Sequence, residues 1–207
     1  MSKEFDDKVA LCVAKTERTP EEEGILTIEF SKCTGSFLHF LRWAKIADPP
    51  TLDNPGGIIP LTLWAHLRII IRSLLTQKLI AVLKARQIGL SWIMAAYALW
   101  FAMSHPAATI MLFSKGEKEA WELLDKCRRI WKQLPDFLRI PVKPDSNEEM
   151  GFPSMMSSIK AFAATESAGV SYTASVLICD EWDWHPFADQ NYTQSKPTRD
   201  AGGQFIG

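Results

Sequence analysis

The segment from Lys84 to Ser91 carries residue types that could bind a phosphate group. It lies between a short apolar run, expected to be a buried strand, and a longer apolar run, expected to be a helix. A helix N-terminus offers free backbone N–H groups and the positive end of its dipole, which suits an anion. Gly89 would let the backbone approach the phosphate closely, and the Ser91 hydroxyl could ligate Mg²⁺. The segment is therefore a candidate phosphate-binding loop.

This loop departs from the usual phosphate-loop pattern, G-x-x-x-x-G-K-[ST]. Lys84 stands at the position of the first glycine, and Leu90 at the position of the lysine. Lys84 or Arg86 could bring the missing cation from the start of the loop, and an arginine can hold phosphate oxygens in a bidentate manner. The alternative is a polar turn with an ordinary helix-capping serine, and the loop alone leaves both open.

A second candidate is the carboxylate pair Asp180–Glu181, which directly follows the apolar run 175–179. Asp180, at the end of a strand, would hold Mg²⁺ mostly through water. Glu181 would orient or deprotonate an attacking water. In an open α/β sheet, ligands bind at the carboxyl ends of the strands, where Ser91 and Asp180 both fall. The candidate phosphate loop and the carboxylate pair together favour Mg-dependent ATP hydrolysis over a chance resemblance of each segment to a nucleotide-binding motif.

Strand and helix signals alternate along the chain and predict an α/β fold with a mostly parallel central sheet flanked by helices. Ser114 and Glu117 predict a capping box at the start of one helix, and Pro135 its end. The expected strands are 79–83, 109–113, 159–163, 175–179 and 203–207, and the expected helices are 61–75, 92–104 and 115–134.

Two domains are expected: an N-terminal helical or irregular region over residues 1–57, and an ATPase core over 58–207. In the first, Thr19 precedes Pro20 and three glutamates, which is typical of a helix start or a charged turn. Residues 37–46 have helical spacing, and residues 48–57 are rich in proline and glycine and are expected to form a loop.

The formal net charge of −1 hides an asymmetry along the chain. Residues 1–60 carry −3, residues 61–143 carry +8 and residues 144–207 carry −6. This distribution argues against a uniformly basic nucleic-acid-binding protein. The basic middle block could still face a polyanion, or could simply form solvated helix faces.

Features that direct a chain out of the cytosol are missing from the sequence. The four cysteines have no metal-binding or C-x-x-C spacing, which favours buried, reduced thiols. The N-terminus is polar and acidic, unlike a signal peptide. The longest apolar run, 92–103, is shorter than the roughly 20 residues that span a bilayer, so a helix buried in protein is expected.

The segment Leu83-Lys-Ala-Arg-Gln-Ile-Gly-Leu-Ser-Trp92 closely resembles the deviant phosphate loop of large terminase subunits, the ATP-driven motors that package DNA into the procapsids of tailed bacteriophages. Other segments resemble this family in the same order, over roughly residues 37–207. They are 110–120 and 134–135, 158–165 before the Asp-Glu pair, 174–182 around it, and 197–198 and 202–206 before a coupling motif.

The resemblance implies a P-loop ATPase of the additional-strand, catalytic-glutamate type. It implies Glu181 and Arg86 as catalytic residues, and Ser91 and Asp180 as the magnesium ligands. ATP and Mg²⁺ are the implied cofactors. The implied ATP-binding residues are Lys84, Ala85, Arg86, Gln87, Ile88, Gly89, Leu90, Ser91 and Trp92.

The resemblance also implies partners: double-stranded DNA, the portal protein and the small terminase subunit. A homo-oligomeric ring on the portal is expected, with a monomer when the chain is isolated, and no membrane is involved. The expected location is the host cytoplasm, outside the mature virion. In relatives a nuclease domain follows the ATPase; this chain is expected to hold most of the ATPase part without the nuclease, and the coupling motif is expected to begin at or just after Gly207.

Two positions depart from the family pattern, and a third residue, His185, is weighed beside them. Leu67 stands where many relatives have a glutamine that reads adenine, and Trp64 could stack on the base instead. The segment 167–170 lacks the arginine that would complete a neighbouring subunit's site in a ring. His185 could sense phosphate, although packing is the simpler role. The other candidates for the missing arginine are Arg128, Arg129, Arg139 and Arg199, each of which could equally be a solvated surface residue.

Two other functions fit the same residues. One is a helicase-like DNA translocase that does not package. The other is a ring subunit that binds nucleotide but hydrolyses it weakly, because Leu90 stands where lysine is usual.

Overall fold

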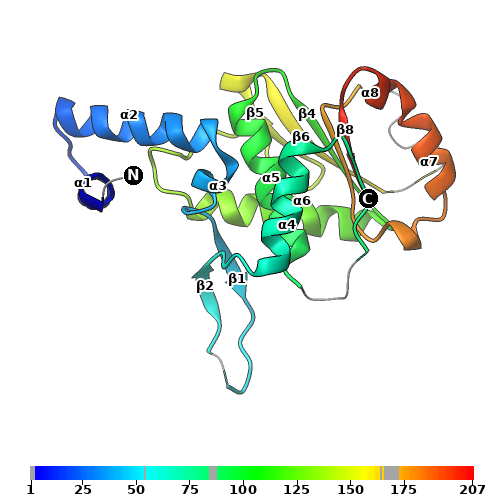
Figure 1. The fold of residues 1–207 in the computed structure, drawn as a ribbon, viewed down its shortest axis with the longest axis horizontal. Coiled ribbons are helices and arrows are strands. Elements are labelled where there is room, and N and C mark those ends of the chain that lie inside the picture. The colour runs from blue at the N-terminus through cyan, green and yellow to red at the C-terminus, as the bar shows by residue number, and fades with distance from the viewer. Residues whose placement is uncertain (1–2, 54, 84–87, 164, 166–172) are drawn as a thin grey trace. The chain divides into compact units, whose positions relative to one another are not determined.

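The computed structural model describes residues 3–53, 55–83, 88–163, 165 and 173–207. The chain divides into two compact units. One comprises residues 1–61 and 130–140, and the other comprises residues 62–129 and 141–207. Each unit is described by itself below, and both are drawn in Figure 1.

The first unit is more regular than the sequence predicts. It contains the helices α1 (Lys3–Val13), α2 (Pro20–Gly35) and α3 (Phe37–Phe40). A hairpin of β1 (Lys45–Asp48) and β2 (Gly57–Pro60) follows, with antiparallel pairing. The expected helix over 37–46 is therefore wrong beyond Phe40, because residues from Lys45 onward pair as a strand.

The start of α2 explains why the charged stretch after Thr19 is a helix and not a turn. The Thr19 hydroxyl accepts a hydrogen bond from the Glu22 backbone N–H, and the Glu22 carboxylate accepts one from the Thr19 N–H. This capping box satisfies two backbone donors that the helix leaves open. Pro20 and the glutamates occupy the first turn, where a fixed φ and negative charge are favourable.

The second unit is built on a sheet with the strand order β3-β8-β7-β4-β6-β5. All neighbours pair in parallel except β5 and β6, which are antiparallel. The strands are β3 (Leu79–Ile80), β4 (Thr109–Ser114), β5 (Glu149–Phe152), β6 (Ser157–Ala163), β7 (Val176–Cys179) and β8 (Gln204–Ile206). The mostly parallel α/β fold is therefore confirmed.

Five further helices accompany this sheet. α5 contacts β4 and β6, α4 contacts α5, and α8 contacts β8. α5 coincides with the long apolar run and is buried along almost its whole length, as expected. No helix in the described ranges is both long and apolar enough to cross a membrane. The helices are α4 (Ala65–Thr76), α5 (Leu90–Ser104), α6 (Glu117–Gln133), α7 (Ala188–Gln194) and α8 (Lys196–Asp200), with short 3-10 helices at Pro153–Met155 and Trp182–Trp184.

Two expectations about element boundaries are wrong. The strand expected over 79–83 is only two residues long, and Leu83 is 99% exposed. Its pairing continues one step further, because the Val82 N–H donates to the Gly207 carbonyl oxygen. Ser114 does not cap α6, because it is buried as the last residue of β4, and the Ala120 N–H bonds to the Gly116 carbonyl oxygen instead.

All four cysteines are buried thiols and form no disulfide, as their spacing predicts. Burial raises the pKa of Cys33 and of Cys127 to about 12, and raises that of Cys179 well above its usual value. Without a bound metal, such thiols are protonated at neutral pH and are poor nucleophiles.

Candidate nucleotide-binding site

Gly89 connects the candidate phosphate loop to α5. It precedes the helix with φ 78° and ψ 2°, a left-handed conformation that glycine adopts without steric cost. Leu90 then begins the helix and is buried, and Ser91 lies in its first turn. Four predicted ATP-binding residues, Lys84, Ala85, Arg86 and Gln87, lie outside the described residues.

The side chains of Ser91 and Asp180 meet although 89 residues separate them in sequence. The Ser91 hydroxyl donates to Asp180 Oδ2 at 2.8 Å. Asp180 directly follows β7, and its backbone N–H is held by the Phe113 carbonyl oxygen at the end of the neighbouring β4. The carboxyl ends of the parallel strands thus place the hydroxyl and the carboxylate together, as predicted for a metal site.

These two oxygens fit Mg²⁺. Magnesium takes oxygen ligands at about 2.0–2.1 Å in octahedral geometry, so adjacent ligand oxygens lie about 3 Å apart. The 2.8 Å separation of Ser91 Oγ and Asp180 Oδ2 suits one such ion with its remaining waters.

Glu181 has a backbone conformation that most residues avoid. Its φ of 54° and ψ of 43° are left-handed, and it stands at the start of the short helix Trp182–Trp184. The two adjacent carboxylates have different partners, because Asp180 accepts from Ser91 and Glu181 pairs with Lys115. Glu181 Oε2 lies 3.1 Å from Lys115 Nζ, in a pair that is partly open to solvent on both sides.

Lys115 is a residue that sequence reasoning missed as part of the site. It directly follows β4, the strand next to β7, so the parallel register brings it beside Glu181. The available signal was its position after a strand end. That signal becomes specific only once β4 and β7 are known to be neighbours.

His185 supports the turn after Asp180. Its ring is buried, and Nε2 donates to the Asp180 carbonyl oxygen at 2.8 Å. Burial lowers the pKa of His185, against the opposing effect of the Asp180 carbonyl. The ring also stacks on Trp182, with centroids 5.8 Å apart. Of the two roles considered for His185, the geometry favours packing.

A cavity of about 910 Å³ opens at this end of the sheet. Cavities of about 300–1,000 Å³ are typical of small-molecule sites. Ser91, Lys115, Asp180 and Glu181 line it on the polar side, and Trp184 adds an exposed aromatic face. Lys115 is its one cation among the residues that the structure describes.

Two residues of α4 lie against Ile88 and Gly89, the described end of the loop. Leu67 is buried, and its Cδ1 lies 3.6 Å from the point where a side chain on Gly89 would begin. His66 Nε2 donates to the Ile88 carbonyl oxygen at 3.0 Å. Trp64 is exposed and, like the half-buried Trp92, is not among the described residues that line the cavity. Leu67 therefore packs against the loop, and base stacking by Trp64 finds no support in this geometry.

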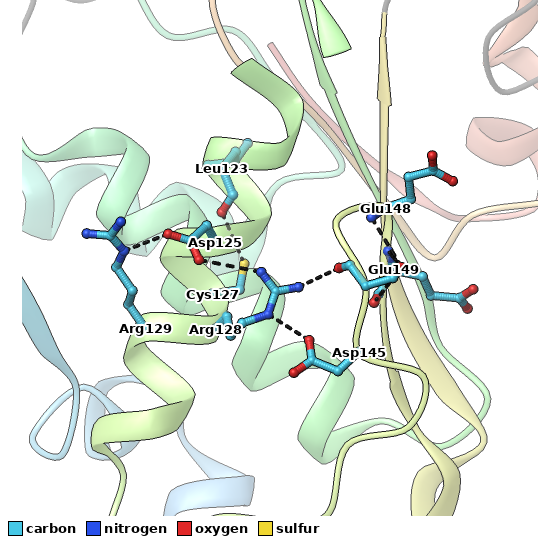
Figure 2. Close-up of polar contacts among 9 residues, drawn as sticks. Leu123, Asp125, Cys127, Arg128, Arg129, Asp145, Glu148 and Glu149 are labelled. Atoms are coloured by element: carbon cyan, nitrogen blue, oxygen red, sulfur yellow. Dashed lines mark hydrogen bonds and ion pairs between the residues drawn. The ribbon is translucent and has the colours of Figure 1, made fainter. Parts of the chain in front are cut away.

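Two candidate arginines for a neighbouring subunit's site are held within the chain. Figure 2 shows Arg128 between Asp125 and Asp145, with Nε donating to Asp145 Oδ1 at 2.6 Å. Arg199 lies over the Tyr192 ring at 3.9 Å and donates to the Tyr192 carbonyl oxygen. To reach a neighbouring subunit, either arginine would first have to break these contacts, which costs more free energy than moving a solvated arginine.

The other two candidate arginines are held less firmly. Arg129 makes a one-turn pair with Asp125 on α6 and is exposed, as in Figure 2. Arg139 reaches the Lys132 carbonyl oxygen at 3.5 Å, a weak contact. The charges of α6 are thus partly paired along one helix, as expected for a solvated face.

The comparisons with known proteins agree with this architecture. Residues 81–204 match the family model described as "Terminase large subunit, T4likevirus-type, N-terminal". No curated protein matches the chain. Among solved structures, the large terminase of bacteriophage HK97 is 13% identical with a TM-score of 0.62, covering 84% of this chain and 36% of that one.

A mutant of the large terminase ATPase domain of Thermus phage P74-26 is 19% identical with a TM-score of 0.53, covering 70% of this chain and 64% of that one. This chain thus spans less than two thirds of either solved chain. At such identities the likeness concerns the fold alone. The family match covers more than half of the chain, and the chain therefore belongs to the T4-like-virus type of terminase large subunits, within their N-terminal part.

Proposed function

We propose that this chain hydrolyses ATP with Mg²⁺ and couples that reaction to moving double-stranded DNA into a procapsid, as part of a ring on the portal that works with the small terminase subunit. The observation that carries the ATPase part is the contact between Ser91 and Asp180 at the carboxyl ends of the strands. The family supports the coupling to DNA packaging.

In this proposal, Ser91 and Asp180 hold the magnesium ion and its waters, and Gly89 with the first turn of α5 receives the phosphates. When bound, Mg²⁺ neutralises charge on the phosphate oxygens. Lys84 and Arg86 supply the loop cations, and Arg86 acts in catalysis. Glu181 orients the attacking water and accepts its proton. We also propose that the ATPase core begins at residue 58, after an N-terminal region that ends at residue 57.

One observation supports a second candidate function, a ring subunit that binds nucleotide but hydrolyses it weakly. Leu90, at the position of the usual phosphate-loop lysine, is apolar and buried in the first turn of α5. It can bring no charge to a phosphate, so activity depends on cations from elsewhere in the chain or from a neighbouring subunit.

The substitution Glu181→Gln tests the catalytic assignment. An amide cannot accept the proton, and general-base catalysis contributes about 10²- to 10⁴-fold, so phosphate release should fall by at least about 10²-fold. Binding of a fluorescent ATP analogue should persist, because the ligands at Ser91 and Asp180 are unchanged. The control is Glu122→Gln, an exposed carboxylate on α6 outside the cavity. A Glu181→Gln chain that releases phosphate at the unmutated rate would refute the assignment.

A further inference from the structure

Three side chains with metal-binding atoms meet inside the first unit, and none of them belongs to the residues proposed to bind ATP. Glu29 and Cys33 lie one turn apart on α2, and His39 follows on α3. A carboxylate oxygen, the Cys33 Sγ and a ring nitrogen of His39 all lie within 4.8 Å of one another. Glu29 is 1% exposed and Cys33 is 0% exposed. The side chain of His39 is 13% exposed, which leaves a path from solvent.

The Glu29 carboxylate is only half satisfied in its buried position. Its Oε1 accepts from His39 Nε2 at 2.7 Å and from Trp43 Nε1 at 3.0 Å. Its Oε2 is buried and finds no hydrogen-bond partner among the described residues. Leaving a buried carboxylate oxygen without a partner is costly, so such an atom needs an explanation. A cation beside it would supply one.

We infer that Glu29, Cys33 and His39 form a binding site for a divalent transition-metal ion of the zinc class. The donor set is one thiol, one imidazole and one carboxylate, which are the ligands of zinc in proteins. Magnesium and calcium prefer oxygen ligands throughout, so a site with Cys33 and His39 does not suit them. The metal site shares no residue with the proposed ATP site. The test of the metal site is therefore independent of the proposed function.

Binding a metal ion here requires little movement of the three side chains. A four-coordinate zinc ion with bonds of about 2.0–2.3 Å keeps its ligand atoms about 3–4 Å apart. The three atoms already lie within 4.8 Å of one another. On binding, the Cys33 thiol releases its proton to solvent and the sulfur bonds to the metal. Three protein ligands leave the fourth position to water.

The expected consequence is a fixed bend between two helices. α2 ends at Gly35, Ser36 is extended, and α3 begins at Phe37. A metal bonded to Glu29 and Cys33 on one side and His39 on the other would fasten this bend. Because the folded unit offers all three ligands at once and an unfolded chain does not, binding would stabilise the fold.

The test uses the purified 207-residue chain. After treatment with a chelator, it is titrated with Co²⁺, which gives visible ligand-field bands and a near-ultraviolet charge-transfer band when a thiolate binds it. The expected result is saturation at about one ion per chain, loss of both bands when Zn²⁺ is added, and a rise in Tm of about 4 °C or more with Zn²⁺.

Matched variants identify the ligands. Cys33→Ser should lose the charge-transfer band and the Tm rise, and His39→Gln should weaken Co²⁺ binding at least tenfold. Cys12→Ser, another buried cysteine of the same unit, should keep both signals. The proposal is overturned if the unmutated chain gives no charge-transfer band, or if Cys33→Ser retains it. The first outcome would leave Glu29, His39 and Trp43 as a hydrogen-bond network alone, and it decides the question even if a variant fails to fold.

Discussion

Glu181 combines an unusual backbone with a charged partner. A left-handed conformation at a residue with a side chain costs about 1–3 kcal/mol and persists only where the surroundings impose it. Here the His185 side chain holds the Asp180 carbonyl oxygen, and the Trp184 N–H donates to the Glu181 carbonyl oxygen. The carboxylate that the proposed mechanism needs thus follows a turn that the His185 side chain, the Trp182 ring stacked on it and the Trp184 backbone N–H support.

Lys115 should matter for nucleotide use. It is the one described cation that lines the cavity, and charge-assisted hydrogen bonds contribute about 1.5–3 kcal/mol. We expect Lys115→Met to lower kcat/KM for ATP by about tenfold or more. Lys118→Met, an exposed lysine on α6, should change it less than about twofold. Equal values for the two variants would show that Lys115 acts only as a surface charge.

His185 should make folding sensitive to mild acid. Burial lowers its pKa below the usual 6.5, so the unfolded chain takes up the proton first as the pH falls. The stability contributed by neutral His185 is present above about pH 6.5 and is lost as the pH falls from there toward the lower folded-state pKa. Urea unfolding at about pH 7.5 and pH 5.5 should show a smaller loss for His185→Asn than for the unmutated chain. An identical loss of stability in both chains would contradict a role for His185 in the acid sensitivity.

At the scale of elements, β8 depends on a close approach to its neighbours. A side chain at Gly203 would begin 2.7 Å from the Ala174 carbonyl oxygen and 2.8 Å from that of Thr198. Both are backbone atoms that cannot move aside cheaply. The bend into β8 therefore requires glycine for space, although its φ is not one that only glycine adopts.

Gly203→Ala should destabilise the chain by about 1–3 kcal/mol, the usual cost of overpacking. Gly24→Ala is the matched control, because no atom lies within 4 Å of its added carbon in α2, and it should be neutral or stabilising by up to about 1 kcal/mol. Chemical denaturation measures the free energy of unfolding of both variants and tests this difference. A Gly203→Ala chain as stable as the control would mean that β8 shifts without cost.

The sequence was a good guide to elements with a strong local signal. The apolar run of α5, the capping box of α2 and the strand before Asp180 follow from local chemistry, and all are found. β5 was missed, because the four residues Glu149–Phe152 are too few for a strong local signal and form a strand by pairing with β6. The pairing of Lys115 with Glu181 was missed for the same reason, since it depends on which strands are neighbours.

At the scale of the whole molecule, the described residues that line the proposed site include no arginine. Arg128 and Arg199 are held by contacts within the chain. In the proposed ring, a second copy would supply the missing charge, so phosphate release per chain should rise with protein concentration. We expect at least about a threefold rise over a hundredfold range of concentration, with saturation when rings form. An inert protein at equal mass should have no effect, and a constant rate per chain would argue against the ring.

The position of β8 has a consequence for the order in which the protein can assemble during synthesis. β3, which leads into the phosphate loop, pairs in the described sheet with β8, whose residues leave the ribosome more than a hundred positions later. By then β4, β5, β6 and β7 already have partners among themselves. A nascent chain that stalls before Gln204 would thus hold a folded half-sheet with its metal carboxylate in place but no strand to fix the phosphate loop beside it. Nucleotide binding would then mark completed translation of this segment.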